Sequence, residues 1–201
     1  YRILGKTCLK ISRMGFGGIP IQRIDAEGTK VLMHQLKDVG INYIDTARGY
    51  TVSEEYLGYA LEGIREHFII ATKSMSRDKE GMAKDIDISL ANLKTDYIDL
   101  YYSHTDDADT PMEETIEAFD SLVKKGKVRV LGGSNYDTWR FSEANAVAKA
   151  GGFTPYSVMQ QRYTYLYPKF NAAPKYAFNE AVNRERLRSL ADTHMPLVAY
   201  S

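Results

Sequence analysis

Five polar residues, each directly after an apolar run, recur at nearly constant spacing along the sequence. They are Asp45, Lys73, His104, Ser134 and Gln160, separated by 28, 31, 30 and 26 residues. Each interval is about the length of one strand and one helix. In a parallel barrel the carboxyl ends of all strands open on one face, where their side chains converge. The spacing therefore predicts that these five side chains share one site.

The residue types in this set favour proton transfer. A lysine beside an aspartate can form an ion pair in a partly dry cleft, here Lys73 with Asp45. A tyrosine hydroxyl against the ammonium would have its pKa lowered from about 10 towards neutral, and Tyr50 is the candidate. Such a tyrosine can protonate a developing alkoxide, and a neutral His104 could donate a hydrogen bond to the same oxygen. None of these groups supplies hydride, so a redox reaction would need a bound cofactor.

Short apolar runs that alternate with helix-like segments must position these residues. The runs are nearly continuous in apolar character, which is typical of strands covered on both faces. Regular alternation of strand and helix favours parallel strands joined by right-handed crossovers. We predict seven such strands: Arg13–Gly17, Asn42–Asp45, His67–Ala71, Tyr97–Tyr102, Val128–Gly132, Tyr156–Met159 and Leu197–Tyr200.

Three of the helix-like segments have start signals. Asp25 and Asp137 are predicted N-caps, and Thr110-Pro111-Met112-Glu113 reads as a capping box with proline at the first helical position. We expect Trp139 and Phe141 to pack the helix after Asp137 onto the sheet. These helices would cover the strands from outside.

A closed barrel is favoured over an open dinucleotide-binding sheet. The glycine cluster Gly15-Phe16-Gly17-Gly18 lacks the third glycine of the dinucleotide fingerprint, and no helix opens directly after it. We therefore predict an α/β fold, a (β/α)8 TIM barrel over residues 1–201 as a single domain. A β-hairpin over Arg2–Ser12 precedes its first strand.

Only seven of the eight strands of such a barrel are found. A complete barrel takes about 250 residues, so we expect the last strand and the C-terminal helices to be missing from this sequence. Tyr165–Phe178, rich in aromatic residues and proline, is expected to be a long loop and the place where residues could be missing.

Composition excludes several classes of protein. Twenty-six basic and 26 acidic residues cancel, which argues against nucleic-acid binding. The longest apolar runs are far shorter than the roughly 20 residues of a membrane-spanning helix, and Tyr1-Arg2-Ile3 does not resemble a signal segment. The single Cys8 excludes an internal disulfide and a cysteine-built zinc site. We expect a cytoplasmic protein without a metal; nothing in the sequence indicates an oligomeric state.

Seven blocks of the sequence, in order and across essentially the whole chain, resemble the aldo-keto reductases. The blocks are Asp45-Thr46-Ala47-Arg48-Gly49-Tyr50, Ser53-Glu54-Glu55-Tyr56-Leu57-Gly58, Ala71-Thr72-Lys73, Asp99-Leu100-Tyr101-Tyr102-Ser103-His104, Gly126-Lys127-Val128-Arg129 with Gly133-Ser134-Asn135, Gln160-Gln161-Arg162-Tyr163 and Ala199-Tyr200-Ser201. The resemblance implies that the four members of the family's catalytic tetrad are Asp45, Tyr50, Lys73 and His104.

The same resemblance implies a nicotinamide dinucleotide, NADP(H) rather than NAD(H), across the barrel mouth. It assigns the cofactor-binding roles as follows: Ser134, Asn135 and Gln160 hold the carboxamide, Tyr200 stacks on the nicotinamide ring, Ser201 begins the loop around the pyrophosphate, and Gly17 and Gly18 let the backbone approach the ring. The residues that recognise the 2′-phosphate would follow Ser201, so the preference for NADP(H) is inferred from kinship only. Thr51 stands where the family commonly has glycine.

These observations predict NAD(P)H-dependent reduction of an aldehyde or ketone to an alcohol, with the proton from Tyr50. A class I aldolase-like enzyme with a Schiff base on Lys73 is the alternative chemistry; Asp45 argues against it because it would keep the lysine charged. A cofactor-sensing regulatory subunit on the same fold is a third possibility, and such a protein need not keep the tetrad. Asp99 is interpreted as structural.

Overall fold

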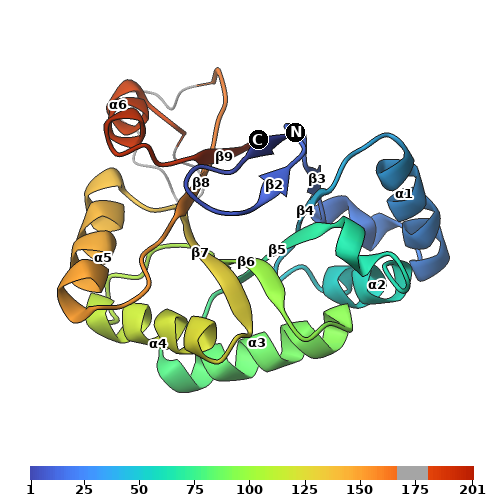
Figure 1. Ribbon diagram of the computed structural model, residues 1–201, viewed down its shortest axis with the longest axis horizontal. Coiled ribbons are helices and arrows are strands. Elements are labelled where there is room, and N and C mark those ends of the chain that lie inside the picture. The colour runs from blue at the N-terminus through green and yellow to red at the C-terminus, as the bar shows by residue number, and fades with distance from the viewer. Residues whose placement is uncertain (167–180) are drawn as a thin grey trace.

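The computed structural model describes residues 1–166 and 181–201 (Figure 1). Its main sheet has seven parallel strands, each hydrogen-bonded to the next one in sequence. They are β3 (Phe16–Gly17), β4 (Tyr43–Asp45), β5 (Ile69–Ser74), β6 (Ile98–Ser103), β7 (Val128–Ser134), β8 (Val158–Arg162) and β9 (Leu197–Tyr200). The predicted order and parallel direction are thus confirmed.

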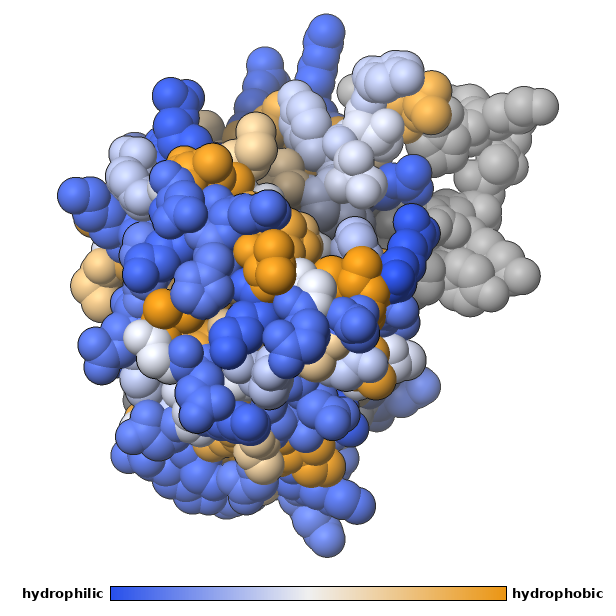
Figure 2. All heavy atoms as spheres, turned by 90° about the vertical axis from the view of Figure 1, so that its right-hand side faces the viewer, coloured by the Kyte–Doolittle hydropathy of each residue, from blue (hydrophilic) through white to orange (hydrophobic). Residues whose placement is uncertain are grey.

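Helices cover the outside of this sheet, as Figure 1 shows. In the described residues they are α1 (Ala26–Asp38), α2 (Ser53–Ala60), α3 (Lys79–Leu93), α4 (Met112–Lys124), α5 (Thr138–Gly151) and α6 (Arg184–Asp192), with 3-10 turns η1 (Ile19–Arg23) and η2 (Arg65–His67). The face over α1 and α2 is mainly hydrophilic, with isolated apolar side chains (Figure 2). The sheet therefore curls as part of a barrel with its helices towards solvent.

Side chains on the two faces of the strands form two separate cores. Outward-facing residues such as Ile44, Ile70 and Leu131 pack with the helices, whereas alternate, inward-facing residues such as Leu100 and Val130 pack together inside the curl. This alternation is the one expected along barrel strands. Burial of both faces explains why the strands have few polar positions.

The predicted N-terminal hairpin is confirmed. β1 (Arg2–Ile3) and β2 (Lys10–Ile11) pair antiparallel, and Leu4, Leu9 and Ile11 join the inner core. The Asn42 side chain, just before β4, bonds to Ser12 and to Lys10. The hairpin therefore closes the amino end of the curled sheet and leaves the carboxyl ends open.

The space between β3 and β9, which we call the seam, is the open side of the curl. The two strands lie at opposite edges of the sheet order, and a cavity of about 1090 Å³ is lined by residues of both. Both chain termini lie beside it in Figure 1.

Several strand bounds differ from those predicted. The first barrel strand is only Phe16–Gly17, whereas β5, β6, β7 and β8 extend beyond their apolar runs through polar residues. Parallel pairing continues because it uses backbone groups: Lys73 pairs with Tyr102, and Ser134 with Gln160. Lys73, Ser134 and Gln160 therefore lie within strands rather than just after them.

The helix start signals were only partly correct. The Asp25 carboxylate accepts a hydrogen bond from the Gly28 amide, as predicted, but Asp137 occupies its N-cap position without such a bond. The capping box at Thr110 is wrong, because α4 begins at Met112 and the Thr110 hydroxyl donates to Asp107 instead. The hydroxyl of Thr110 therefore bonds to a nearby carboxylate instead of capping the helix.

Three other expectations can be compared with the structure. Phe141 is buried as predicted, but Trp139 is 64% exposed, so its predicted packing on the sheet is wrong. Trp139 lies in the first turn of α5, with its side chain open to solvent. The predicted loop Tyr165–Phe178 lies outside the described residues except for its first two.

Candidate active site at the carboxyl ends of the strands

Lys73 and Asp45 form the ion pair predicted from their spacing. Lys73 is 1% exposed, and its ammonium donates to Asp45 Oδ1 and to the carbonyl of Thr46, at 2.8 Å. The pairing of β4 with β5 brings the two strand ends side by side. Because a buried charge is costly without partners, these two oxygens are what keep the ammonium in place.

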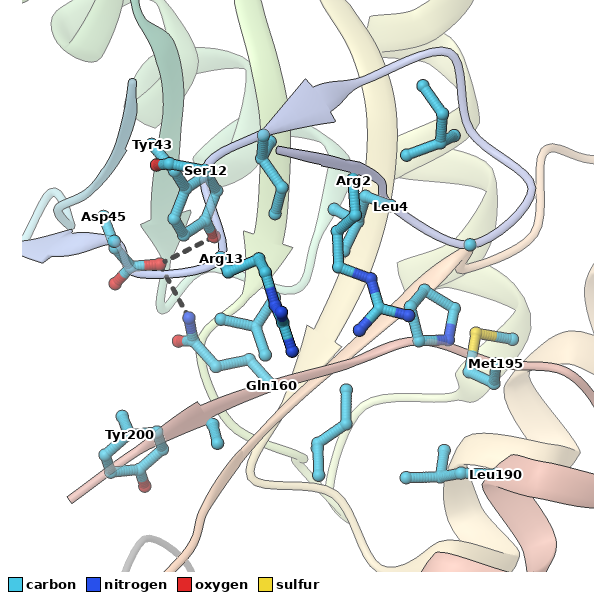
Figure 3. A pocket seen from close by; sticks show the side chains of 18 of the residues that line it. Arg2, Leu4, Ser12, Arg13, Tyr43, Asp45, Gln160, Leu190, Met195 and Tyr200 are labelled. Carbon is cyan, nitrogen blue, oxygen red and sulfur yellow. Dashed lines mark hydrogen bonds between the residues drawn. The ribbon is translucent and has the colours of Figure 1, made fainter. Parts of the chain in front are cut away.

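Asp45 is also bonded from the far side of the curl. Its Oδ2 accepts from Gln160 Nε2 at 2.6 Å and from the Tyr43 hydroxyl at 3.2 Å (Figure 3). Gln160 is on β8, four strands away from β4 in the sheet order. In a flat sheet four steps would separate the strands by about 19 Å. The bond therefore exists only because the sheet curls.

Tyr50 lies in the loop after β4, against both the lysine and the histidine. The Lys73 ammonium is 5.2 Å from the centroid of the Tyr50 ring. The ring of His104 meets it edge to face, with centroids 5.7 Å apart. The structure thus brings together the four residues predicted as the tetrad.

The expected lowering of the Tyr50 pKa is wrong for this structure. Burial first, and then the Asp45 carboxylate, raise the pKa of Tyr50 to about 12. The physical reason is that burial disfavours the charged phenolate, and that the nearby Asp45 carboxylate repels it. Tyr50 therefore carries its proton at neutral pH.

His104 is neutral, as the predicted chemistry requires. Burial first, and then the Lys73 ammonium, lower its pKa to about 4, while Asp45 acts in the opposite direction. Its Nδ1 is buried and has no hydrogen-bond partner among the described residues. A neutral ring adds no charge to the site.

The polar residues assigned to the cofactor form a continuous hydrogen-bonded set. Asn135 Nδ2 donates to the Ser134 hydroxyl at 3.0 Å and to the His104 carbonyl at 2.9 Å. The Tyr200 hydroxyl donates to Asn135 Oδ1, and Ser134 donates to Gln160 at 3.4 Å. Asn135 has a positive φ of 57°, which asparagine tolerates well. These side chains therefore meet at one rim with the tetrad.

The two glycines and Ser201 have different surroundings. A Cβ on Gly17 would meet nothing within 4 Å, whereas one on Gly18 would lie 2.8 Å from the Ser53 hydroxyl and 3.1 Å from the Asp45 carbonyl. Gly18 therefore allows α2 to pack on the end of β4. Gly17 and Ser201 line the seam cavity together with Asp45, Gln160 and Tyr200. Most of that cavity lies along the seam rather than over Tyr50.

Sequence reasoning missed two buried charged residues next to the site. Arg77, 5% exposed, follows β5, and Glu54, 1% exposed, accepts a hydrogen bond from Thr72 and pairs with Arg48 of the Tyr50 loop at 3.7 Å. Arg77 could have been found by the rule that marked Lys73, a polar residue close to a strand end. Glu54 gave no signal beyond its place in a resembling block.

Two predicted absences concern metals and membranes. Among residues 1–166 and 181–201, no cluster of three or more histidine, cysteine or acidic side chains could hold a metal ion. Within the same ranges, every helix is too short or too polar to cross a bilayer. Asp99, interpreted as structural, pairs with Arg65 and Arg129 at 2.9 and 3.0 Å.

Comparison with known proteins identifies the family. The family model described as the aldo/keto reductase family matches residues 13–201. The chain belongs to the aldo/keto reductase family. It is 33% identical over 185 residues to a norsolorinic acid reductase of Emericella nidulans, covering 81% of this chain and 48% of that protein. It is 34% identical over 167 residues to an aldo-keto reductase of Bacillus subtilis, covering 74% of this chain and 50% of that protein.

Another relative is named as a channel subunit. A putative voltage-gated potassium channel subunit beta of Schizosaccharomyces pombe is 29% identical over 185 residues, covering 83% of this chain and 54% of that protein. The chain spans about half the length of the curated relatives it matches. The family is one of oxidoreductases that use nicotinamide cofactors.

The residues at the rim fit a nicotinamide. A carboxamide needs both hydrogen-bond donors and acceptors, and Ser134, Asn135 and Gln160 offer both kinds. Ser134 bonds to both Gln160 and Asn135, whereas Gln160 also donates to Asp45 and Asn135 also donates to the His104 carbonyl. The open side of Gly17 leaves room for a ring.

Proposed function

We propose that the protein containing this chain reduces an aldehyde or ketone to an alcohol with NADPH. The observation that carries the proposal is the contact of Tyr50 with Lys73 and His104, next to the bond between Asp45 and Gln160. Bound NADPH would supply hydride from the nicotinamide C4 to the carbonyl carbon. The chain's own residues would do the rest.

Tyr50 would supply the proton. Its raised pKa keeps the phenol protonated at neutral pH, and an alkoxide, a stronger base than a phenolate, would take that proton as it forms. Lys73 would lie under the ring as a fixed cation, held by Asp45. We therefore assign to Lys73 the stabilisation of the phenolate that remains after transfer.

His104 would orient the substrate. As a neutral imidazole beside Tyr50 it can donate one hydrogen bond to the carbonyl oxygen while the phenol approaches the same atom. Two donors on one oxygen would fix its position and polarise the bond. Because the ring is uncharged, it would not compete with Tyr50 as the acid.

The cofactor assignments belong to the same proposal. Ser134, Asn135 and Gln160 would hold the carboxamide, Tyr200 would stack on the ring, and Ser201, Gly17 and Gly18 would border it. We propose NADP(H) over NAD(H) because the family generally uses it. An eighth strand would pair with β3 and β9 in the seam and complete the barrel. We also propose that the protein is cytoplasmic.

The two alternatives can be compared with the site. The ion pair of Lys73 disfavours a Schiff base, which requires a neutral amine. A regulatory role gains support from the relative named as a channel subunit beta, although all four tetrad residues are present here. Turnover by the full-length protein would discriminate between a regulator and an enzyme.

The test is oxidation of NADPH, and separately of NADH, by the full-length protein with a panel of aldehydes and ketones. Reduced nicotinamide is followed by its absorbance, and the alcohol is identified by mass spectrometry. We expect turnover with at least one aldehyde, faster with NADPH. Tight binding of NADPH without any turnover would instead favour the regulatory role.

A further inference from the structure

Arg77 is a buried arginine at the carboxyl end of β5. Its Nη1 donates to the carbonyls of Ser74, at 3.2 Å, and Ser76, at 2.9 Å, and its Nη2 donates to the carbonyl of Thr105. Within the described residues no carboxylate lies at ion-pair distance from it. The guanidinium is therefore hydrogen-bonded to backbone carbonyl oxygens near the ends of two neighbouring strands.

These oxygens lie on both sides of His104. The Ser74 carbonyl also accepts from the His104 amide at 2.9 Å, and Thr105 is the residue after His104. The His104 carbonyl is held from the other direction by Asn135. The backbone that carries the imidazole is thus bonded from β5 by Arg77 and from β7 by Asn135.

Arginine suits this place better than lysine would. Its planar fork has several donors in fixed directions and can bind carbonyls on two segments at once, whereas an ammonium is a compact point charge. Burying a cation without an anion is costly. A hydrophobic side chain could fill the same volume without that cost. Packing alone therefore does not explain why an arginine is buried here.

We propose that Arg77 is a positioning residue of this site, which fixes the imidazole of His104 by binding the backbone around it. The charge of Arg77 acts in the same place. The charged and titratable groups that face His104 are Asp45, Tyr50, Lys73 and Arg77. Burial lowers the pKa of His104 most, and both cations add to this effect, whereas Asp45 opposes it. The kinetic part of this inference depends on the proposed function; the structural part does not.

The experiment compares three variants of the full-length protein. Arg77→Met removes the fork and the charge, and Arg77→Lys removes the fork alone. Arg65→Met is the control, because Arg65 also bonds backbone carbonyls, those of Phe68 and Tyr97, but at the amino ends of β5 and β6. It also removes the ion pair with Asp99, where Arg129 remains as a partner. Thermal unfolding of each variant measures the general loss of stability.

The first measurement is the NMR titration of the histidine ring protons, with the His104 signals assigned by their loss in His104→Gln. We expect the pKa of His104 to rise in Arg77→Met, to stay near its wild-type value in Arg77→Lys and to be unchanged in Arg65→Met. An unchanged His104 titration in Arg77→Met would overturn the electrostatic part of the inference.

The second measurement is the kinetics of carbonyl reduction. Small misplacement of a reacting group can cost about 100-fold in rate, so we expect kcat to fall at least tenfold in both Arg77 variants, with the Kd for NADPH nearly unchanged. A kcat in Arg77→Lys equal to wild type would contradict the positioning role, as would equal losses in Arg65→Met. If the wild-type protein shows no turnover but the pKa of His104 still rises in Arg77→Met, the proposed function is overturned and the placement of Arg77 is supported.

Discussion

The rings of Tyr50 and His104 meet edge to face with their centroids 5.7 Å apart. One residue comes from the loop after β4 and the other directly follows β6, so two strand ends must be fixed for the contact to form. Both rings are uncharged at neutral pH, because burial raises the pKa of Tyr50 and lowers the pKa of His104. The contact thus places the proposed proton donor beside the proposed neutral hydrogen-bond donor.

Replacement of Tyr50 by phenylalanine tests the proton donor. Tyr50→Phe keeps the ring against His104 and Lys73 but removes the hydroxyl, so we expect kcat for carbonyl reduction to fall by at least about 100-fold, the range of general acid catalysis. The Kd for NADPH, measured by fluorescence, should change little. A variant that keeps most of its kcat would exclude Tyr50 as the acid.

Removing one partner of the Lys73–Asp45 pair should be more damaging than removing both. Asp45→Asn leaves a 1% exposed ammonium without its carboxylate, and loss of one partner from a buried pair costs about 3–5 kcal/mol. We expect the double variant Asp45→Asn/Lys73→Met to unfold at a higher urea concentration than Asp45→Asn. Additive losses in this double-mutant cycle would show that the two residues do not interact.

The lowered pKa of His104 predicts a loss of stability in mild acid. At neutral pH the ring is neutral both folded and unfolded, so it contributes nothing. As the pH falls below about 6.5, His104 binds a proton in the unfolded chain, whereas in the folded protein it binds one only near pH 4. The free energy of unfolding therefore decreases over this range. A shift of this size corresponds to roughly 3 kcal/mol.

Urea unfolding between pH 7 and pH 4 measures this effect. Carboxylates also titrate in this range, so the comparison is with His104→Gln, which removes only the histidine contribution. The stability of His104→Gln should fall less steeply with acid than that of wild type. Parallel curves would mean that the ring is protonated as readily in the folded protein as in the unfolded chain.

Thr51 offers a test of backbone strain beside Tyr50. It has a positive φ of 43°, which costs a β-branched residue about 1–2 kcal/mol, and its hydroxyl donates to Gln22 at 2.9 Å. Thr51→Gly loses this bond but relieves the backbone strain. Thr51→Ala also loses the bond but keeps a side chain at a positive φ, and therefore keeps the strain. We expect the glycine variant to be the more stable of the two by about 0.5–1 kcal/mol after the entropy of glycine is included, as measured by thermal unfolding.

The sequence alone predicted the order and parallel direction of the strands, and it proposed most residues of the candidate site. Strand order followed from apolar runs, and Asp45, Lys73 and His104 were found because each marks a strand end at a regular interval. Both signals, the apolar runs and the polar residues that follow them, can be recognised from neighbouring residues in the sequence. Helices such as α6, with only Arg186 and Leu190 buried, lacked an apolar stripe and were missed.

Tertiary structure decided how the groups act on one another. The bond between Asp45 and Gln160 needs the curl of the whole sheet, and the sign of the Tyr50 pKa shift depends on burial and on the nearby Asp45 carboxylate. Arg77 is held by the carbonyls of Ser74, at the end of β5, and Thr105, just after β6. Electrostatic effects sum over neighbours at a few ångströms, and those neighbours are far apart in the sequence, so the residues could be listed from spacing but their protonation could not.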